Sequence, residues 1–138
     1  MGNPGAEPAR ALALTTDADL MGTIERELAV LEISLQIART VGQAVAALID
    51  DPPPRAQLLL ADFDAISAMD VVQLHQVRER GWFGAIIAIG NVPEEFIKSL
   101  NLHRILPRPI AADALRRAVA AVGLGNRTRR ISTLRGQR

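Results

Sequence analysis

An aspartate closes one of the most apolar stretches of this chain. Residues 58–61 read Leu-Leu-Leu-Ala, Asp62 follows them directly, and Asp64 stands two positions further on. A short apolar run of this kind predicts a buried strand. In an open sheet of parallel strands, binding and chemistry are placed at the carboxyl ends of the strands. We therefore expect Asp62 to lie at the functional edge of such a sheet.

Two threonines and an aspartate follow the first predicted strand, residues 11–14, and should reach the same edge. They are Thr15, Thr16 and Asp17. We expect residues 15–17 to cap the first helix.

A basic residue follows the last predicted strand, residues 104–106. It is Arg108, with Pro109 after it. A guanidinium group can hold a carboxylate through two parallel hydrogen bonds, so Arg108 could pair with Asp62 and lock the site in one state. Two other interpretations stay open: a solvated acid at Asp62, and a plain loop residue at Asp64.

Short apolar runs and amphipathic segments alternate along residues 10–123. Strands are predicted at residues 11–14, 34–38, 58–61, 85–89 and 104–106. A helix follows each strand, the last one over residues 112–122, and Asp17 and Asn91 are predicted to cap the first and fourth helices. This alternation predicts an α/β fold, a doubly wound five-stranded parallel sheet with helices on both faces. Because crossovers are right-handed, few strand orders remain, and the flavodoxin-like order 2-1-3-4-5 is one of them.

The composition excludes several classes of protein. The 138 residues suffice for one domain, 49% of them are apolar, and the absence of cysteine excludes disulfides and thiolate metal sites. No apolar run approaches the roughly 18 residues needed to cross a bilayer, so we expect a cytoplasmic protein with no membrane partner. Aromatic residues make up 3% of the chain, too few for a platform that stacks single-stranded nucleic acid. No glycine-rich loop follows the first strand, so no nucleotide or flavin site is expected.

The two ends of the chain differ from its middle. Residues 1–9 predict a flexible arm, and residues 124–138 predict an Arg-rich disordered tail. The five arginines of the tail leave 11 basic against 15 acidic residues in the rest of the chain. The tail could contact phosphates or an acidic partner, or it could be the start of a linker. We do not expect nucleic acid as a partner, because no helix-turn-helix segment stands outside the core.

Over residues 10–123 the chain resembles the receiver domains of bacterial response regulators. The resemblance rests on the strand–helix alternation, on Asp62 ending the third strand, and on Arg108-Pro109 after the fifth. It implies a reaction in which a histidine kinase passes a phosphoryl group to the third-strand aspartate. In that family an acidic pair after the first strand holds Mg²⁺ and a lysine before the proline binds the phosphoryl group. A hydroxyl ending the fourth strand and an aromatic residue on the fifth then switch a partner surface.

Asp62 falls on the phosphoacceptor position, with Asp64 in the loop after it, but the rest of the family's site is replaced. The positions of the acidic pair, the lysine, the switch hydroxyl and the aromatic residue fall on Thr15 and Thr16 (with Asp17 just beyond them), on Arg108, on Gly90 and on Ile105. The family's Mg²⁺ is a hard cation that prefers carboxylate oxygens. The threonine hydroxyls bring no charge, so Asp62 would share the ion with Asp17 or Asp64. We expect no cofactor, with Mg²⁺ bound weakly at best. Gly90 has no hydroxyl to follow a phosphoryl group, and Ile105 has no ring to swing. The resemblance is therefore to a degenerate, pseudo-receiver type.

The sequence thus predicts a stand-alone receiver domain that acts in two-component signal transduction as a phosphorylation-independent protein–protein interaction module. It is not expected to be an enzyme. Its partner would be a kinase, a regulator or a localisation factor. Two alternatives remain: a weakly active phosphoacceptor response regulator using Asp62, and a nucleic-acid-associated regulator acting through the Arg-rich tail.

The resemblance also implies where a partner binds. In receiver domains the last two helices and the fifth strand form the usual partner or dimer surface. The charged residues of that surface would be Glu94, Glu95 and Lys98 on one helix and Asp113, Arg116 and Arg117 on the other. Opposite charges on the two helices could pair across a two-fold axis and give a homodimer. Simple solvation of both helices is the alternative.

Overall fold

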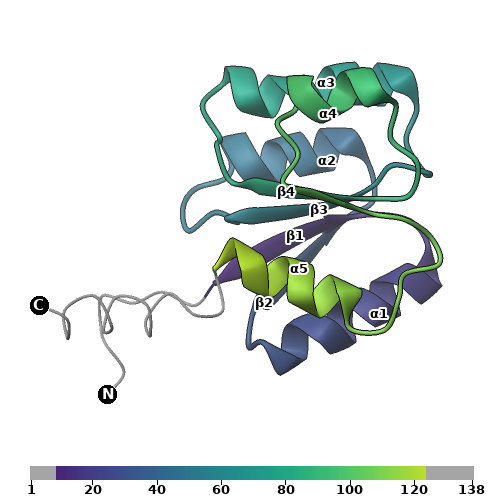
Figure 1. Ribbon diagram of the computed structural model, residues 1–138. Helices are drawn as coiled ribbons and strands as arrows, with labels where there is room; N and C mark the ends of the chain where they lie inside the picture. The colour runs from purple at the N-terminus through teal and green to yellow at the C-terminus, as the bar shows by residue number, and fades with distance from the viewer. Residues whose placement is uncertain (1–8, 124–138) are drawn as a thin grey trace, which may run out of the picture.

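Five parallel strands form one sheet at the centre of the molecule, and helices cover both of its faces (Figure 1). The computed structural model describes residues 9–123, so the predicted Arg-rich tail and nearly all of the predicted N-terminal arm lie outside the described residues. The strands are β1 (Arg10–Leu14), β2 (Ser34–Ala38), β3 (Leu58–Asp62), β4 (Ala85–Ile89) and β5 (Arg104–Leu106). They lie in the order β2-β1-β3-β4-β5, which confirms the predicted flavodoxin-like sheet.

The connections between the strands are helical. The helices are α1 (Ala18–Val30), α2 (Val41–Val45), α3 (Ala68–Glu79), α4 (Glu94–Ser99) and α5 (Ala114–Val122), and a π-helical turn (Ala46–Asp50) continues α2. In Figure 1, α1 and α5 lie below the sheet, and α2, α3 and α4 lie above it. Among the described residues 9–123, no helix is long and apolar enough to span a membrane.

The side chains of the central strands alternate between two apolar cores. Leu12, Leu59 and Ile86 belong to the core shared with α2 and α3, whereas Leu58 and Ile87 belong to the core shared with α1 and α5. β3 is buried along its whole length, as expected for a parallel strand covered on both faces. The two cores hold β3 in place and thereby fix its last residue, Asp62, at the carboxyl edge of the sheet.

Polar side chains start two of the longer helices. The Asp17 carboxylate caps α1 by accepting hydrogen bonds from the backbone N–H groups of Asp19 and Leu20. Ser67 and Asp70 form a reciprocal capping box at the start of α3. The predicted cap of the first helix at Asp17 is thereby confirmed, and it places this carboxylate next to the end of β1.

Two predicted helix starts are wrong. α4 begins at Glu94 and is preceded by Pro93, which makes no side-chain cap bond, whereas Asn91 was expected to cap it. Asn91 instead gives its backbone N–H to the carboxylate of Asp64, so it belongs to the carboxyl edge of the sheet. α5 begins later than predicted, because Asp113 has a φ of +66° and a left-handed residue cannot lie inside a right-handed helix.

Candidate functional site

The carboxyl edge of the sheet gathers three aspartates around one arginine. Asp62 is the last residue of β3, Asp64 follows it in the next loop, Asp17 starts α1, and Arg108 lies in the loop after β5. These residues come from three segments that are far apart in the sequence. The segments meet here because parallel strands end at a common edge.

The guanidinium group of Arg108 contacts all three carboxylates. Its Nη1 donates to Asp62 Oδ1 and to Asp64 Oδ2, both at 2.8 Å. Its Nη2 donates to Asp17 Oδ2 at 3.0 Å and to Asp62 Oδ2 at 3.3 Å. These four bonds match the four hydrogens of the two terminal nitrogens. The predicted pair between Arg108 and Asp62 is therefore present and bidentate, and it belongs to a larger cluster.

Asp62 is almost fully enclosed, with 2% of its surface exposed, and its carboxylate is saturated with hydrogen bonds. Oδ1 accepts from Arg108 Nη1 and, at 3.2 Å, from the backbone N–H of Asp64. Oδ2 accepts from Arg108 Nη2 and, at 2.8 Å, from the hydroxyl of Thr15. A carboxylate offers about four acceptor positions, so groups of the chain itself fill them all. Asp62 is thus not the solvated acid that was one of the open interpretations.

The charges of this cluster stabilise one another. Burial by itself would raise the pKa of Asp62, but the hydrogen bonds from Arg108 and Thr15 and the positive charge of Arg108 outweigh it, so the pKa lies below its ordinary value. The hydrogen bond to Asp62 in turn raises the pKa of Arg108, with Asp64 adding to the effect. Asp62 is therefore ionised and Arg108 is charged at neutral pH.

The two threonines after β1 have different places. Thr15 is buried, and its hydroxyl donates to Asp62 and accepts from the backbone N–H of Asp17 at 3.0 Å. Thr15 therefore orients the aspartate and is not the helix cap that the sequence predicted. Thr16 is exposed, and in the described part of the chain no hydrogen bond joins its side chain to the cluster.

Asp64 links Arg108 to the loop before α4. Its Oδ2 accepts from Arg108, and its Oδ1 accepts from the backbone N–H of Asn91 at 3.0 Å. Gly90 lies next to the Asp64 carboxylate and has a φ of +98°. A Cβ at position 90 would lie 2.3 Å from Asp64 Oδ2. The Asp64 carboxylate thus fills the space that a side chain at position 90 would need. Ile105, on β5, packs against the core on the side of α2 and α3.

The cluster does not fit the Mg²⁺ site that the resemblance to receiver domains implies. Mg²⁺ needs a near-octahedral set of oxygen ligands. Here the oxygens of Asp17, Asp62 and Asp64 are directed at the guanidinium of Arg108. As the side chains lie here, with Arg108 among the three carboxylates, no group of three or more His, Cys, Asp or Glu side chains within residues 9–123 is arranged to hold a metal ion.

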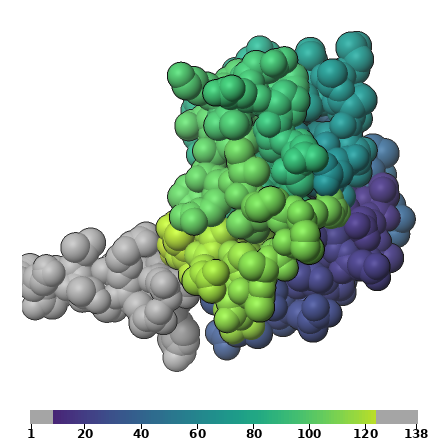
Figure 2. Space-filling model, turned by 45° about the vertical axis from the view of Figure 1, so that its right-hand side comes forward, coloured from purple at the N-terminus to yellow at the C-terminus, as the bar shows by residue number. Residues whose placement is uncertain are grey.

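The predicted partner surface is exposed on one face of the molecule. Figure 2 shows α4 (green) and α5 (yellow-green) on the same face. Of the charged residues predicted for this surface, Glu94, Glu95, Lys98, Asp113 and Arg117 are exposed. Arg116 is partly committed within the chain, because its Nε donates to Glu27 of α1 at 2.8 Å, while Asp113 lies 3.9 Å from its Nη2.

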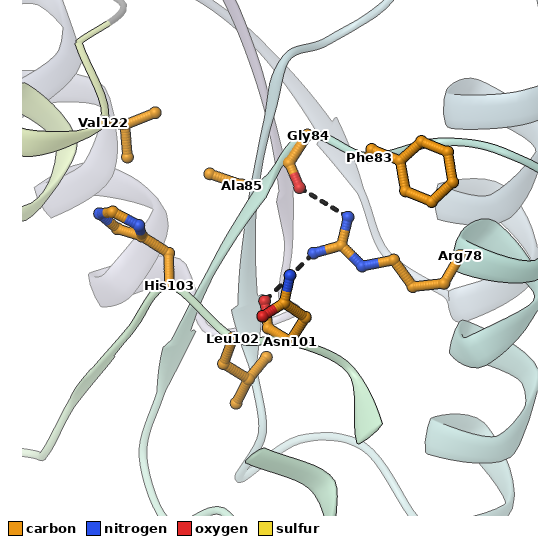
Figure 3. Close-up of a pocket in the computed structure, with 8 residues that line it drawn as sticks. All are labelled: Arg78, Phe83, Gly84, Ala85, Asn101, Leu102, His103 and Val122. Atoms are coloured by element: carbon orange, nitrogen blue, oxygen red, sulfur yellow. Dashed lines mark hydrogen bonds between the residues drawn. The ribbon is translucent and has the colours of Figure 1, made fainter. Parts of the chain in front are cut away.

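A cleft at the opposite edge of the sheet is lined by none of the predicted site residues. Its volume is about 420 Å³, and Figure 3 shows Arg78 reaching into it from α3. The Arg78 guanidinium donates to the carbonyl oxygens of Leu100, Trp82, Gly84 and Asn101 at 2.7–3.3 Å. Burial lowers the pKa of Arg78. These contacts join the end of α3 to the loops before β4 and β5, so Arg78 has a structural role that the sequence analysis missed.

Comparisons with known proteins place this fold. No protein-family model and no curated protein matches the chain. The solved structures similar to it include the chemotaxis protein CheY4 of Vibrio cholerae, with a TM-score of 0.70 and 16% identity over 84% of this chain and 99% of that chain. A response regulator receiver domain protein from Clostridium thermocellum has a TM-score of 0.67 and 16% identity over 89% and 98% of the two chains.

A third similar structure is the signal receiver domain of a modulated diguanylate cyclase from Desulfovibrio desulfuricans G20. Its TM-score is 0.66, and its identity is 21% over 84% of this chain and 94% of that chain. At these identities the likeness shows the fold, while the roles of the site residues rest on the geometry above. The chain has the fold of the response-regulator receiver domains.

Proposed function

We propose that this protein is a pseudo-receiver, a receiver-type domain that acts in bacterial two-component signal transduction as a phosphorylation-independent protein–protein interaction module. One observation carries the proposal. Each oxygen of the Asp62 carboxylate accepts two hydrogen bonds from groups of the chain itself. No acceptor position of Asp62 is left for a reacting group, which favours a role in binding and not in catalysis.

Phosphoryl transfer makes demands that this arrangement does not meet. The accepting carboxylate must present a free oxygen in line with the leaving group, and metal ions neutralise the charge that develops. Asp62 is enclosed, and the carboxylates that could hold a metal ion beside it are bonded to Arg108. Gly90 offers no hydroxyl to bind a phosphoryl group, and the Asp64 carboxylate fills the space that a side chain at position 90 would need. A weakly active phosphoacceptor at Asp62 is therefore the less favoured function.

The partner of such a module is another protein, and we place its binding surface on α4, β5 and α5. The exposed charges there have both signs, which suits a kinase, a regulator or a localisation factor, or a second copy of the chain across a two-fold axis. On α4 and α5, Lys98 and Arg117 are the basic residues that remain exposed, since Arg116 is bonded to Glu27. The cytoplasm is the compartment that this role requires.

The proposal is tested by recording amide NMR spectra of the protein while Mg²⁺ and then beryllofluoride, a mimic of the phosphoryl group, are added. We expect no change at millimolar additions, because Arg108 already fills the site. The matched control is Asp62→Asn, which cannot be phosphorylated and should respond in the same way. Shifts that begin at Asp62 in the wild-type protein alone and spread to α4 and α5 would show a working phosphoacceptor and overturn the proposal.

A further inference from the structure

We propose that Arg108 is a built-in cation: its guanidinium takes the place of a divalent metal ion among Asp17, Asp62 and Asp64, and removing it turns this edge of the sheet into a cation-binding site. The inference deepens the proposed function, because it names what holds the site in one state without metal or phosphate. It rests on the disagreement between the Mg²⁺ that the fold implies and the ligands that the chain presents.

The first step is the convergence of charge. Three carboxylates lie within 3.0 Å of one guanidinium group, and a carboxylate beside other carboxylates is destabilised unless a cation separates them. Asp17 and Asp64 keep 42% and 37% of their side-chain surface exposed, so water screens them, but Asp62 keeps only 2%. The charge of Asp62 therefore depends on Arg108, and without Arg108 the carboxylate would take up a proton or bind another cation.

The second step is the shape of the cluster. The guanidinium is held from three directions: by Asp17 at the start of α1, by Asp62 at the end of β3, and by Asp64 in the loop between β3 and α3. Oxygen ligands from several separate segments that face one cation are what a divalent metal site needs. The Arg108 guanidinium lies between these oxygens and donates its hydrogens to them. A metal ion could therefore bind the same oxygens only where the guanidinium is absent.

The third step is the reach of the cluster beyond the ion. Asp64 also accepts a hydrogen bond from the backbone N–H of Asn91, in the loop that leads to α4. One guanidinium therefore ties together the carboxyl-edge loops after β1, β3, β4 and β5. Because Arg108 is part of the chain, this connection is always present and does not vary with the concentration of a metal ion.

The test compares the melting temperatures of the wild-type protein, Arg108→Ala and Arg80→Ala in MgCl₂ and in NaCl of equal ionic strength. Arg80 is the matched control, because it pairs with the single carboxylate of Asp50 at an exposed site. We expect Mg²⁺ to raise the melting temperature of Arg108→Ala by roughly 3–6 °C when it stands at tenfold excess over its dissociation constant. The wild-type protein and Arg80→Ala should not respond to Mg²⁺ beyond the NaCl effect.

A second readout locates the ion. Mn²⁺ is paramagnetic and broadens the NMR signals of nearby amides, so in Arg108→Ala it should broaden residues 15–17 and 62–64 and leave the wild-type spectrum unchanged. If Arg108→Ala does not fold without added ions, Arg108→Lys keeps one positive charge with fewer donors and should show a smaller response to both ions.

Two outcomes would overturn the inference: an Arg108→Ala protein as insensitive to Mg²⁺ and Mn²⁺ as the two references, or a wild-type protein that binds Mn²⁺ at the same residues as tightly as the variant. Neither outcome is the one that overturns the proposed function, which fails on a beryllofluoride response of the wild-type protein. The two proposals can therefore fail separately.

Discussion

A side chain at position 90 and the carboxylate of Asp64 cannot occupy the same space, and this conflict gives a quantitative prediction. We consider Gly90→Ser, which places a hydroxyl at the position that carries one in receiver domains. A Cβ on Gly90 would lie 2.3 Å from Asp64 Oδ2 and 2.5 Å from its Cγ. Contacts this short force Asp64 to turn away. It then loses its hydrogen bonds to Arg108, at 2.8 Å, and to the backbone N–H of Asn91, at 3.0 Å.

The cost can be worked from these contacts. Hydrogen bonds to charged groups contribute about 1.5–3 kcal/mol each when buried. Asp64 is 37% exposed, so water replaces part of what is lost, and we take about 2 kcal/mol for both bonds together. The φ of +98° adds strain of about 1–2 kcal/mol for any residue with a Cβ. Gly90→Ser should therefore lower the free energy of unfolding by about 3–4 kcal/mol.

In a protein that already carries Asp64→Gly, the clash is gone and only the strain remains, so Gly90→Ser should cost about 1–2 kcal/mol. Urea denaturation of the wild-type protein, both single variants and the double variant measures the coupling between the two sites. Gly81→Ser is the matched control, because Gly81 also has a φ of +98° and a Cβ there would meet nothing within 4 Å. It should show the strain alone.

The reasoning is refuted if Gly90→Ser costs the same in both backgrounds to within about 0.5 kcal/mol, the usual limit of additivity. It is also refuted if Gly81→Ser costs as much as Gly90→Ser in the wild-type background. Either result would mean that Asp64 gives way freely and does not hold the loop before α4.

Two further predictions concern the ionised groups. Asp62→Asn removes a buried charge from the cluster and should lower the free energy of unfolding by about 2 kcal/mol at neutral pH. The lowered pKa of Asp62 means that its contribution is fully present above the ordinary value of 3.8 and is lost as the pH falls through the lower, folded-state pKa. Urea denaturation across the acid range should therefore show the difference between wild type and Asp62→Asn shrinking below about pH 4, and a constant difference would contradict the pairing. Arg78→Met leaves four carbonyl oxygens without their donor and should cost about 2–4 kcal/mol, whereas Arg55→Met, which removes one exposed bond to the Asp51 carbonyl, should cost less than about 0.5 kcal/mol in the same assay.

The fold followed from the sequence because its signals are strong and local. Residues 58–61 and 85–89 are apolar throughout, and such runs form central parallel strands whatever lies around them. Right-handed crossovers then left few strand orders, and the observed order is among them. The errors fall at helix starts, where loop conformation decides. Nothing in the residue type of Asp113 announces its positive φ.

The candidate site was predictable only in part. The pairing of Arg108 with Asp62 was predictable, because the two residues have opposite charge and follow strands that end at the same edge of the sheet. That Asp17 and Asp64 join the same guanidinium depends on the paths of two loops, for which the sequence carries no periodic signal. The sequence predicts a helix cap at Thr15 because its hydroxyl is typical of caps, but Thr15 is buried and its hydroxyl donates to Asp62.

The substitutions at this edge depend on one another, and that dependence decides how the site can change. Replacing Arg108 alone leaves Asp62 buried without its counter-charge, and restoring a hydroxyl at position 90 alone collides with Asp64. Metal-dependent chemistry at this edge would thus require changes at Arg108, Asp64 and Gly90 together, since a change at Arg108 or Gly90 alone gives a less stable protein. A single substitution in such a cluster therefore does not suffice for metal-dependent chemistry. Under the function proposed above, the same contacts that close Asp62 to a phosphoryl group also keep the loop before α4 in one position.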